Sequence, residues 1–125
     1  QIRTVQYHGT STEINDRQET HAVRMAFGAH AEHLRGSSIK GAIGHPQGAC
    51  GLASLVAMLG AARGLDGAAP FLPPTLHLEN PDPACDLDYT PNHARELTPE
   101  PGGDAMLLNC LAFGAKNTAL VVRSS

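Results

Sequence analysis

The sequence lacks tryptophan and is poor in aromatic residues, with two tyrosines and three phenylalanines among 125 residues. It also lacks a strong excess of either charge: nine Lys and Arg against twelve Asp and Glu give a formal net charge of −3. Nucleic-acid-binding surfaces need clustered basic residues, and the basic residues here are scattered. The composition therefore argues against nucleic acid as a partner, while 42% hydrophobic and 17% charged residues are typical of one globular domain.

Cysteines are few and lack the spacing of a zinc site or a disulfide framework. Cys50, Cys85 and Cys110 form no CxxC pair and leave an odd count, which favours a reducing compartment and predicts a cytoplasmic protein. Four of the seven histidines lie in polar or proline-rich stretches and are expected to be solvated or structural: His30, His33, His77 and His93. We therefore expect no resident metal and no bound cofactor.

Charged residues are missing altogether from residues 41–62. A membrane-spanning helix is the first interpretation of such a run. However, His45, Pro46 and four glycines before Leu59 make it too polar and too interrupted to span a bilayer. We expect a helix buried between layers instead, and we find no signal-peptide pattern.

Alternation and apolar periodicity predict a mixed α/β fold. The expected order is a strand over 2–7, a helix over 17–34, a strand over 37–40, a helix over 46–63, a proline-rich loop over 66–92 with short strands near 76 and 87–89, and strands over 105–113 and 118–123. Asn15 or Asp16 is expected to cap the first helix, and Gly36 and Gly64 to end the two helices. Helices after the first two strands favour parallel pairing, and the turn at 114–117 adds an antiparallel hairpin.

Two histidines in glycine-flanked turns are the strongest chemical signal. His8 follows the first expected strand, and His45 opens the uncharged helix five residues after Lys40, where the second expected strand ends. Carboxyl ends of neighbouring parallel strands meet at one edge of a sheet. Two neutral imidazoles there are suited to donate hydrogen bonds to a carbonyl oxygen that develops negative charge. The positive end of the helix dipole points to the same place.

Other side chains join this constellation. Thr10 and Thr12 place hydroxyls at its rim, and Glu19 in the first helix is positioned to pair with Lys40 or to orient it. Each of these residues taken alone is more typical of a turn, a strand end or a solvated helix surface. Their combination in one register favours a functional site.

Four ordered motifs resemble the carboxyl-terminal half of β-ketoacyl-acyl carrier protein synthases, condensing enzymes of the thiolase-like superfamily. The motifs are YHGTST at 7–12 with Asn15, Asp16 and Glu19, KGAIGHPQGACG at 40–51, PPTL at 73–76 with ENPD at 79–82 and CDL at 85–87, and NCLAFGAKN at 109–117. They cover nearly the whole chain. The resemblance implies the carboxyl-terminal half of a thiolase-like fold, with a mixed sheet and a buried helix.

The resemblance also implies a reaction. Members of the family join an acyl group held on a cysteine to a malonyl unit carried by acyl carrier protein, with loss of carbon dioxide. His8 and His45 would stabilise the enolate, and Lys40 and Glu19 would form a supporting charged pair. Thr10 and Thr12 would bind the phosphopantetheine arm of the carrier protein. Phe113, followed by Gly114, would gate the acyl pocket and supply part of the oxyanion hole.

Departures from the family pattern refine these expectations. Cys50 and Cys110 stand where alanine and serine are usual, so we interpret both as small buried residues. Pro46 replaces a usual threonine, and proline is well tolerated at the first position of a helix. In the hairpin, Ala115 and Lys116 replace glycine and threonine, and a Cβ at position 115 is expected to restrict the turn.

We expect residues 1–125 to form a single carboxyl-terminal ketosynthase domain, a fragment without the amino-terminal half that carries the nucleophilic cysteine. The isolated fragment is predicted to be inactive, and the full-length protein to be a homodimer or heterodimer that binds malonyl and acyl thioesters. Two alternatives remain open from the sequence: a non-catalytic partner subunit that sets chain length, and a module that binds acyl carrier protein or pantetheine without chemistry.

Overall fold

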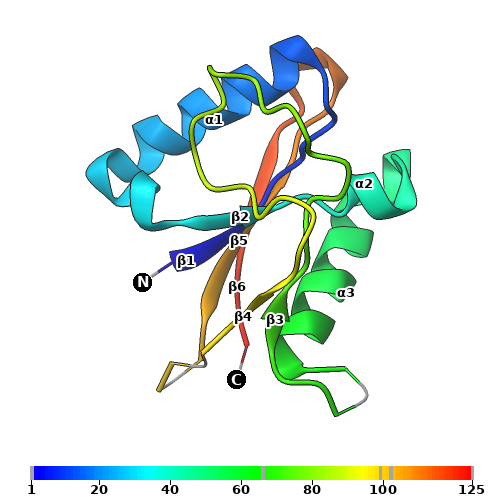
Figure 1. The fold of residues 1–125 in the computed structure, drawn as a ribbon. Coiled ribbons are helices and arrows are strands. Elements are labelled where there is room, and N and C mark those ends of the chain that lie inside the picture. The colour runs from blue at the N-terminus through cyan, green and yellow to red at the C-terminus, as the bar shows by residue number, and fades with distance from the viewer. Residues whose placement is uncertain (1, 66, 99, 102, 125) are drawn as a thin grey trace.

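The computed structural model describes residues 2–65, 67–98, 100–101 and 103–124. Its centre is a four-stranded sheet with the order β2-β1-β5-β6 (Figure 1). The strands are β1 (Ile2–Gln6), β2 (Arg35–Ser37), β5 (Ala105–Cys110) and β6 (Thr118–Arg123). β1 is parallel to both β2 and β5, and β5 is antiparallel to β6, so the predicted mixed sheet is confirmed.

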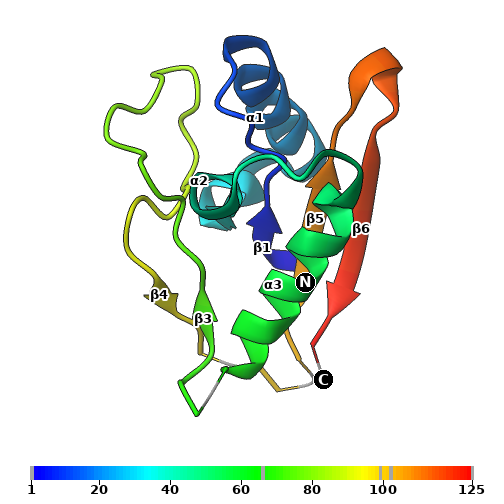
Figure 2. The ribbon, with the colours of Figure 1, turned by 90° about the vertical axis from the view of Figure 1, so that its right-hand side faces the viewer.

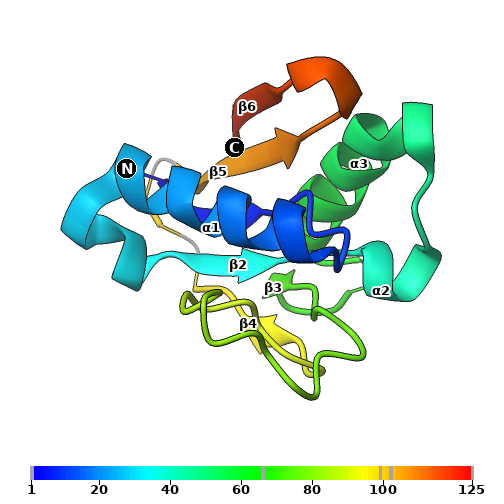
Figure 3. The ribbon, with the colours of Figure 1, turned by 90° about the horizontal axis from the view of Figure 1, so that it is seen from above.

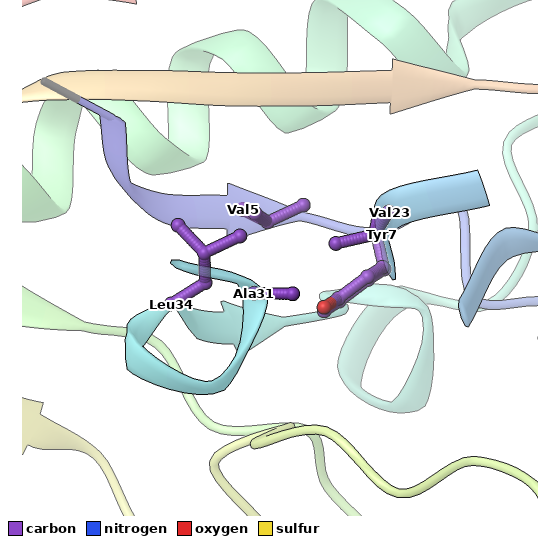
Figure 4. Packing of buried hydrophobic residues seen from close by; sticks show 5 residues of the cluster. All are labelled: Val5, Tyr7, Val23, Ala31 and Leu34. Carbon is purple, nitrogen blue, oxygen red and sulfur yellow. The ribbon is translucent and has the colours of Figure 1, made fainter. Parts of the chain in front are cut away.

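Helices pack on this sheet through two separate hydrophobic clusters. The first lies between β1, helix α1 (Glu13–Phe27) and the following 3-10 segment η1 (Gly28–His33), and consists of Val5, Tyr7, Val23, Ala31 and Leu34 (Figure 4). The second joins helix α3 (Cys50–Arg63) to β5, with Met58, Met106 and Leu108 among its buried members (Figure 2). Because side chains alternate along a strand, Leu107 instead packs against the first cluster, so the two clusters use opposite faces of β5.

The first helix begins and ends earlier than the sequence predicts. Thr12 precedes it in place of Asn15 or Asp16, and the helix ends at Gly28, which has a φ of 54°, in place of Gly36. Gly36 lies in β2, where a Cβ would come within 2.0 Å of the Tyr7 ring. Its role is therefore close packing between β1 and β2 and not helix termination.

The second strand and the second helix also have different bounds from those expected. β2 ends at Ser37, and Lys40 begins a short helix, α2 (Lys40–Ile43), in place of ending a strand. The predicted helix over 46–63 is divided into a 3-10 turn η2 (Gln47–Ala49) and α3, which ends before Gly64 as expected. The chain leaves the sheet after Ser37 because the Ser38 N–H donates to the Thr75 hydroxyl instead of to a strand.

Helix α3 buries only one face in the described chain. Ser54, Met58 and Ala61 are buried against the sheet, whereas Leu52 and Val56 are exposed. Burial on both sides, as the uncharged sequence led us to expect, is thus not reached within these residues. No helix among the described residues combines the length and the apolar character that crossing a membrane requires.

The proline-rich segment lies beyond β2, on the side of the sheet away from β6 (Figure 3). It contains the antiparallel pair β3 (Phe71–Leu72) and β4 (Arg95–Glu96). The short strands predicted near 76 and 87–89 are wrong, since only single bridges form, from Thr75 to Pro91 and from Arg35 to Asp88. Pro73 and Pro74 lack the N–H groups that a longer ladder would need.

The predicted hairpin is confirmed, but its first strand ends at Cys110 and not at 113. The connection contains a short turn, η3 (Phe113–Ala115), in which Gly114 has a φ of 73° and Ala115 a φ of 58°. Only one of these two left-handed residues is a glycine. The predicted restriction at Ala115 therefore takes the form of a strained backbone.

We expect Ala115→Gly to raise the free energy of unfolding by about 0.5–1 kcal/mol. A Cβ in the left-handed region costs about 1–2 kcal/mol, while glycine adds about 0.5–1 kcal/mol of unfolded-state entropy. The matched control is Gly114→Ala, whose new Cβ would meet no atom within 4 Å and which should lower the free energy of unfolding by a similar amount. Urea unfolding of both variants measures the two free energies of unfolding. Changes of the same sign in the two variants would contradict the predicted strain at Ala115.

Candidate active site

His8 lies directly beyond β1 and is 5% exposed. The strand direction continues through Tyr7, whose N–H donates to the Ser37 carbonyl at 2.8 Å. The backbone N–H groups of His8 and Gly9 then turn away from the sheet and donate to Glu19 Oε1 and Oε2, at 2.8 and 3.0 Å. These backbone hydrogen bonds thus position His8 independently of the contacts that its ring makes.

Glu19 anchors this turn from helix α1. Its carboxylate is 3% exposed and accepts a third hydrogen bond, from Asn109 Nδ2 near the end of β5, at 3.0 Å. Burial raises the pKa of Glu19, and the three donors oppose that rise by stabilising the charged form. One carboxylate therefore joins the ends of β1 and β5 to α1.

Lys40 approaches His8 from the opposite side. Its Nζ donates to the His8 carbonyl and lies 3.4 Å from His8 Nδ1 and 3.1 Å from Cys50 Sγ. The predicted ion pair between Lys40 and Glu19 is wrong: none of the ion pairs among the described residues joins them. Glu19 holds the N–H of His8 and Lys40 holds its carbonyl, so the two charges act on opposite ends of one residue.

His45 completes the pair that the sequence predicts. Its ring centroid lies 5.3 Å from that of His8, with the ring planes at 78°. The side chain is exposed, and its Nδ1 accepts a hydrogen bond from the Gln47 N–H at 2.9 Å. A neutral imidazole whose Nδ1 accepts carries its proton on Nε2, so His45 presents an Nε2–H donor.

The electrostatics of His8 lead to the same tautomer. Burial, the Lys40 ammonium and His45 together lower the pKa of His8 to about 4, which keeps the ring neutral at neutral pH. The ammonium that faces Nδ1 has no acceptor capacity, so Nδ1 accepts and the proton lies on Nε2. Both imidazoles therefore use Nδ1 as an acceptor within the chain, which leaves Nε2–H as the group of each ring that can donate to a substrate oxygen.

Thr10 and Thr12 lie beside the histidines rather than between them. Their hydroxyl oxygens are 2.9 Å apart, and both residues line a cavity of about 380 Å³. Glu19, Lys40 and the loop from Leu76 to Leu78 line the same cavity, whereas His8 and His45 do not. The predicted substrate-binding threonines thus share a cavity with Lys40, which itself contacts His8.

Phe113 and Gly114 lie in the turn between β5 and β6, and the Phe113 side chain is fully exposed. It therefore packs against none of the other predicted site residues in this chain.

Sequence reasoning missed the contribution of Asn109, although a signal was available. Asn109 opens the last motif, and the parallel register that pairs Gln6 with Leu108 places it beside the residues that follow β1. Sequence reasoning also treated Cys50 as a filler of space, whereas its sulfur contacts Lys40 and lies 3.7 Å from His8 Nδ1.

Comparison with known proteins gives consistent matches. The family model of the C-terminal domain of beta-ketoacyl synthases matches residues 1–79. The chain is 41% identical over 98% of its length to a 3-oxoacyl-(acyl-carrier-protein) synthase 2 of Synechocystis sp., and 44% identical over 92% to the enzyme of the same name from Coxiella burnetii. It covers 27% and 26% of these relatives and thus spans about a quarter of their length.

A solved structure of a beta-ketoacyl synthase from Burkholderia phymatum superimposes with a TM-score of 0.79 and 34% identity, over 99% of this chain and 28% of that one. The α/β architecture described above is thus that of thiolase-like ketosynthases. With the family model matching well over half of its residues, the chain belongs to the β-ketoacyl synthase family and corresponds to the C-terminal domain.

Proposed function

We propose that this chain is the carboxyl-terminal domain of a β-ketoacyl-acyl carrier protein synthase and supplies the two histidines of its active site. The reaction is the decarboxylative Claisen condensation of an acyl thioester with malonyl-acyl carrier protein, in fatty acid or polyketide synthesis. The observation that supports the proposal is the pairing of the His8 and His45 rings, each of which accepts at Nδ1 within the chain and keeps its proton on Nε2.

Decarboxylation of a malonyl thioester breaks the bond between the carboxylate and the central carbon. Carbon dioxide leaves, and the bonding electrons move into an enolate whose charge lies on the thioester oxygen. Hydrogen bonds from Nε2 of His8 and His45 stabilise that oxygen. Neutral donors suit this step because they hold the enolate without delivering a full proton to it, which leaves its carbon nucleophilic.

Condensation follows when the enolate carbon attacks the carbonyl carbon of an acyl group held on a cysteine. The new carbon–carbon bond forms as the carbon–sulfur bond breaks, and the cysteine leaves as a thiolate. In the family this cysteine belongs to the amino-terminal half. The chain covers only about a quarter of these relatives, so most of their length lies outside it, which is compatible with that division of the site.

The remaining predicted residues receive supporting roles. Glu19 and Lys40 are positioning residues that fix the His8 backbone, and Lys40 also holds the ring neutral. Thr10 and Thr12 bind the phosphopantetheine arm of the carrier protein in the cavity that they line. Phe113 and Gly114 gate the acyl pocket once the face of β5 and β6 is covered by the rest of the protein.

The first test is malonyl decarboxylation by the protein that carries this chain. Replacement of His8 or His45 by alanine removes one donor to the enolate oxygen, and we expect a loss of about 100- to 1,000-fold in the rate of carbon dioxide release. The matched control is His21→Ala, an exposed histidine on helix α1. Release of labelled carbon dioxide from malonyl-acyl carrier protein measures the rate.

Wild-type-like rates in both histidine variants would contradict the proposal. A protein that binds acyl carrier protein but releases no carbon dioxide, even before mutation, would instead be a chain-length partner or a binding module.

The second test concerns the neutrality of His8. Lys40→Met removes a positive charge beside the ring, so the pKa of His8 should rise from about 4 toward the ordinary value of 6.5, with burial still holding it below that value. Because the pKa of His8 is depressed on folding, its contribution to stability is present above pH 6.5 and is lost as pH falls through 4. Lys40→Met should therefore reduce the pH dependence of the free energy of unfolding in this range.

Long-range nitrogen–proton NMR spectra of the imidazoles report both the tautomer and the pKa. The matched control is Lys116→Met, which removes the same charge from the exposed hairpin turn. If the pKa of His8 were the same in the two lysine variants, Lys40 would have no part in keeping the ring neutral.

A further inference from the structure

Two of the three cysteines meet beside His8. Cys50 is the first residue of α3, and Cys110 is the last residue of β5. Their sulfur atoms and a ring nitrogen of His8 all lie within 4.8 Å of one another. Cys50 and Cys110 lie sixty positions apart in the sequence, and the spacing of the cysteines alone does not reveal that they meet.

The two thiols differ in their surroundings. Cys50 is 2% exposed, and its Sγ lies 3.1 Å from Lys40 Nζ and 3.7 Å from His8 Nδ1. Cys110 is partly exposed, and burial together with the Cys50 thiol raises its pKa. The more accessible sulfur is therefore that of Cys110, and the sulfur in contact with the site is that of Cys50.

We propose that Cys50 and Cys110 form a reversible disulfide that acts as a redox switch on the His8 site. A disulfide needs a sulfur–sulfur distance of about 2.05 Å. Closing the remaining gap requires rotation about the Cα–Cβ bonds of the two cysteines. The strand and the helix that carry the two cysteines already pack together, so no rearrangement of distant segments is required.

The oxidant is a low-molecular-weight disulfide such as oxidised glutathione. Cys110, as its thiolate, attacks this disulfide and forms a mixed disulfide, and one small thiol leaves. The sulfur of Cys50 then attacks the Cys110 sulfur, the second small thiol leaves, and the two protein sulfurs are joined. Two protein thiols are oxidised, and one small disulfide is reduced to two thiols.

The bond changes what lies next to His8 Nδ1. In the reduced chain the Cys50 sulfur contacts Lys40, and Lys40 holds the His8 carbonyl. In the disulfide the Cys50 sulfur is drawn toward β5, so Lys40 loses its contact with that sulfur and keeps only its contacts with His8. The family usually has alanine and serine at these two positions, so the switch belongs to this chain.

The same three side chains also resemble a metal site, but Lys40 argues against one. Its ammonium lies 3.1 and 3.4 Å from two of the three donor atoms and would repel a cation placed among them. The disulfide faces no such repulsion, since its formation leaves no charge on either sulfur.

Peptide mapping of the protein that carries this chain provides the test. Trypsin separates the three cysteines, with Cys50 in residues 41–63, Cys85 in 64–95 and Cys110 in 96–116. After incubation in a glutathione redox buffer, we expect a linked pair of peptides 41–63 and 96–116, two mass units lighter than their sum. Dithiothreitol should release the pair. The link should persist in Cys85→Ser and be absent in Cys110→Ser and Cys50→Ala.

Three results would overturn the proposal: glutathione adducts on both cysteines without the link, a link from either cysteine to Cys85, or protection of both thiols by zinc without oxidation. Oxidation should also lower malonyl decarboxylation at least tenfold in the wild type but not in Cys110→Ser. That readout rests on the proposed function, whereas the peptide map does not. A link without an effect on activity would overturn the switch, whereas the absence of a link would overturn the disulfide itself.

Discussion

The arrangement of this domain depends on one buried carboxylate. Glu19 accepts three hydrogen bonds, two from the backbone turn after β1 and one from Asn109 at the end of β5. A buried charge without such donors would cost several kcal/mol. With them, the carboxylate is satisfied by donors that follow or belong to two strands, β1 and β5, and that meet at helix α1. These hydrogen bonds fix the turn that carries His8 against helix α1.

Glu19 and Lys40 act on His8 in a way that an ion pair could not. In a direct ion pair the two charges would neutralise each other. The N–H and the carbonyl of His8 would then lack their present partners. Here the negative charge meets the N–H of His8 and the positive charge meets its carbonyl, so both are stabilised by backbone dipoles. Burial of the imidazole, together with the uncancelled ammonium, then lowers the pKa of His8 and keeps the ring neutral.

Much of this arrangement follows from the sequence, because it rests on periodicity and turn chemistry. The mixed sheet, the hairpin and the proximity of the two histidine turns all come from strand order and from glycine-flanked turns. The sequence misplaces Lys40 at a strand end and pairs it with Glu19, since side-chain partners depend on how far the chain has turned after Ser37. It likewise treats Cys50 and Cys110 as unrelated, because their meeting depends on how α3 packs against β5.

Gly36 shows how far the influence of the site reaches. The Tyr7 ring occupies the space where a side chain at position 36 would lie. The Asp88 carbonyl oxygen would also lie only 2.7 Å from a Cβ at that position. Tyr7 is joined to His8 by a single peptide bond. A residue with no functional group therefore helps to position an imidazole just beyond the end of the neighbouring strand. Among natural variants of this domain, position 36 should tolerate as little change as the histidines themselves, and conservation there would reflect the lack of room for a side chain and not a chemical role.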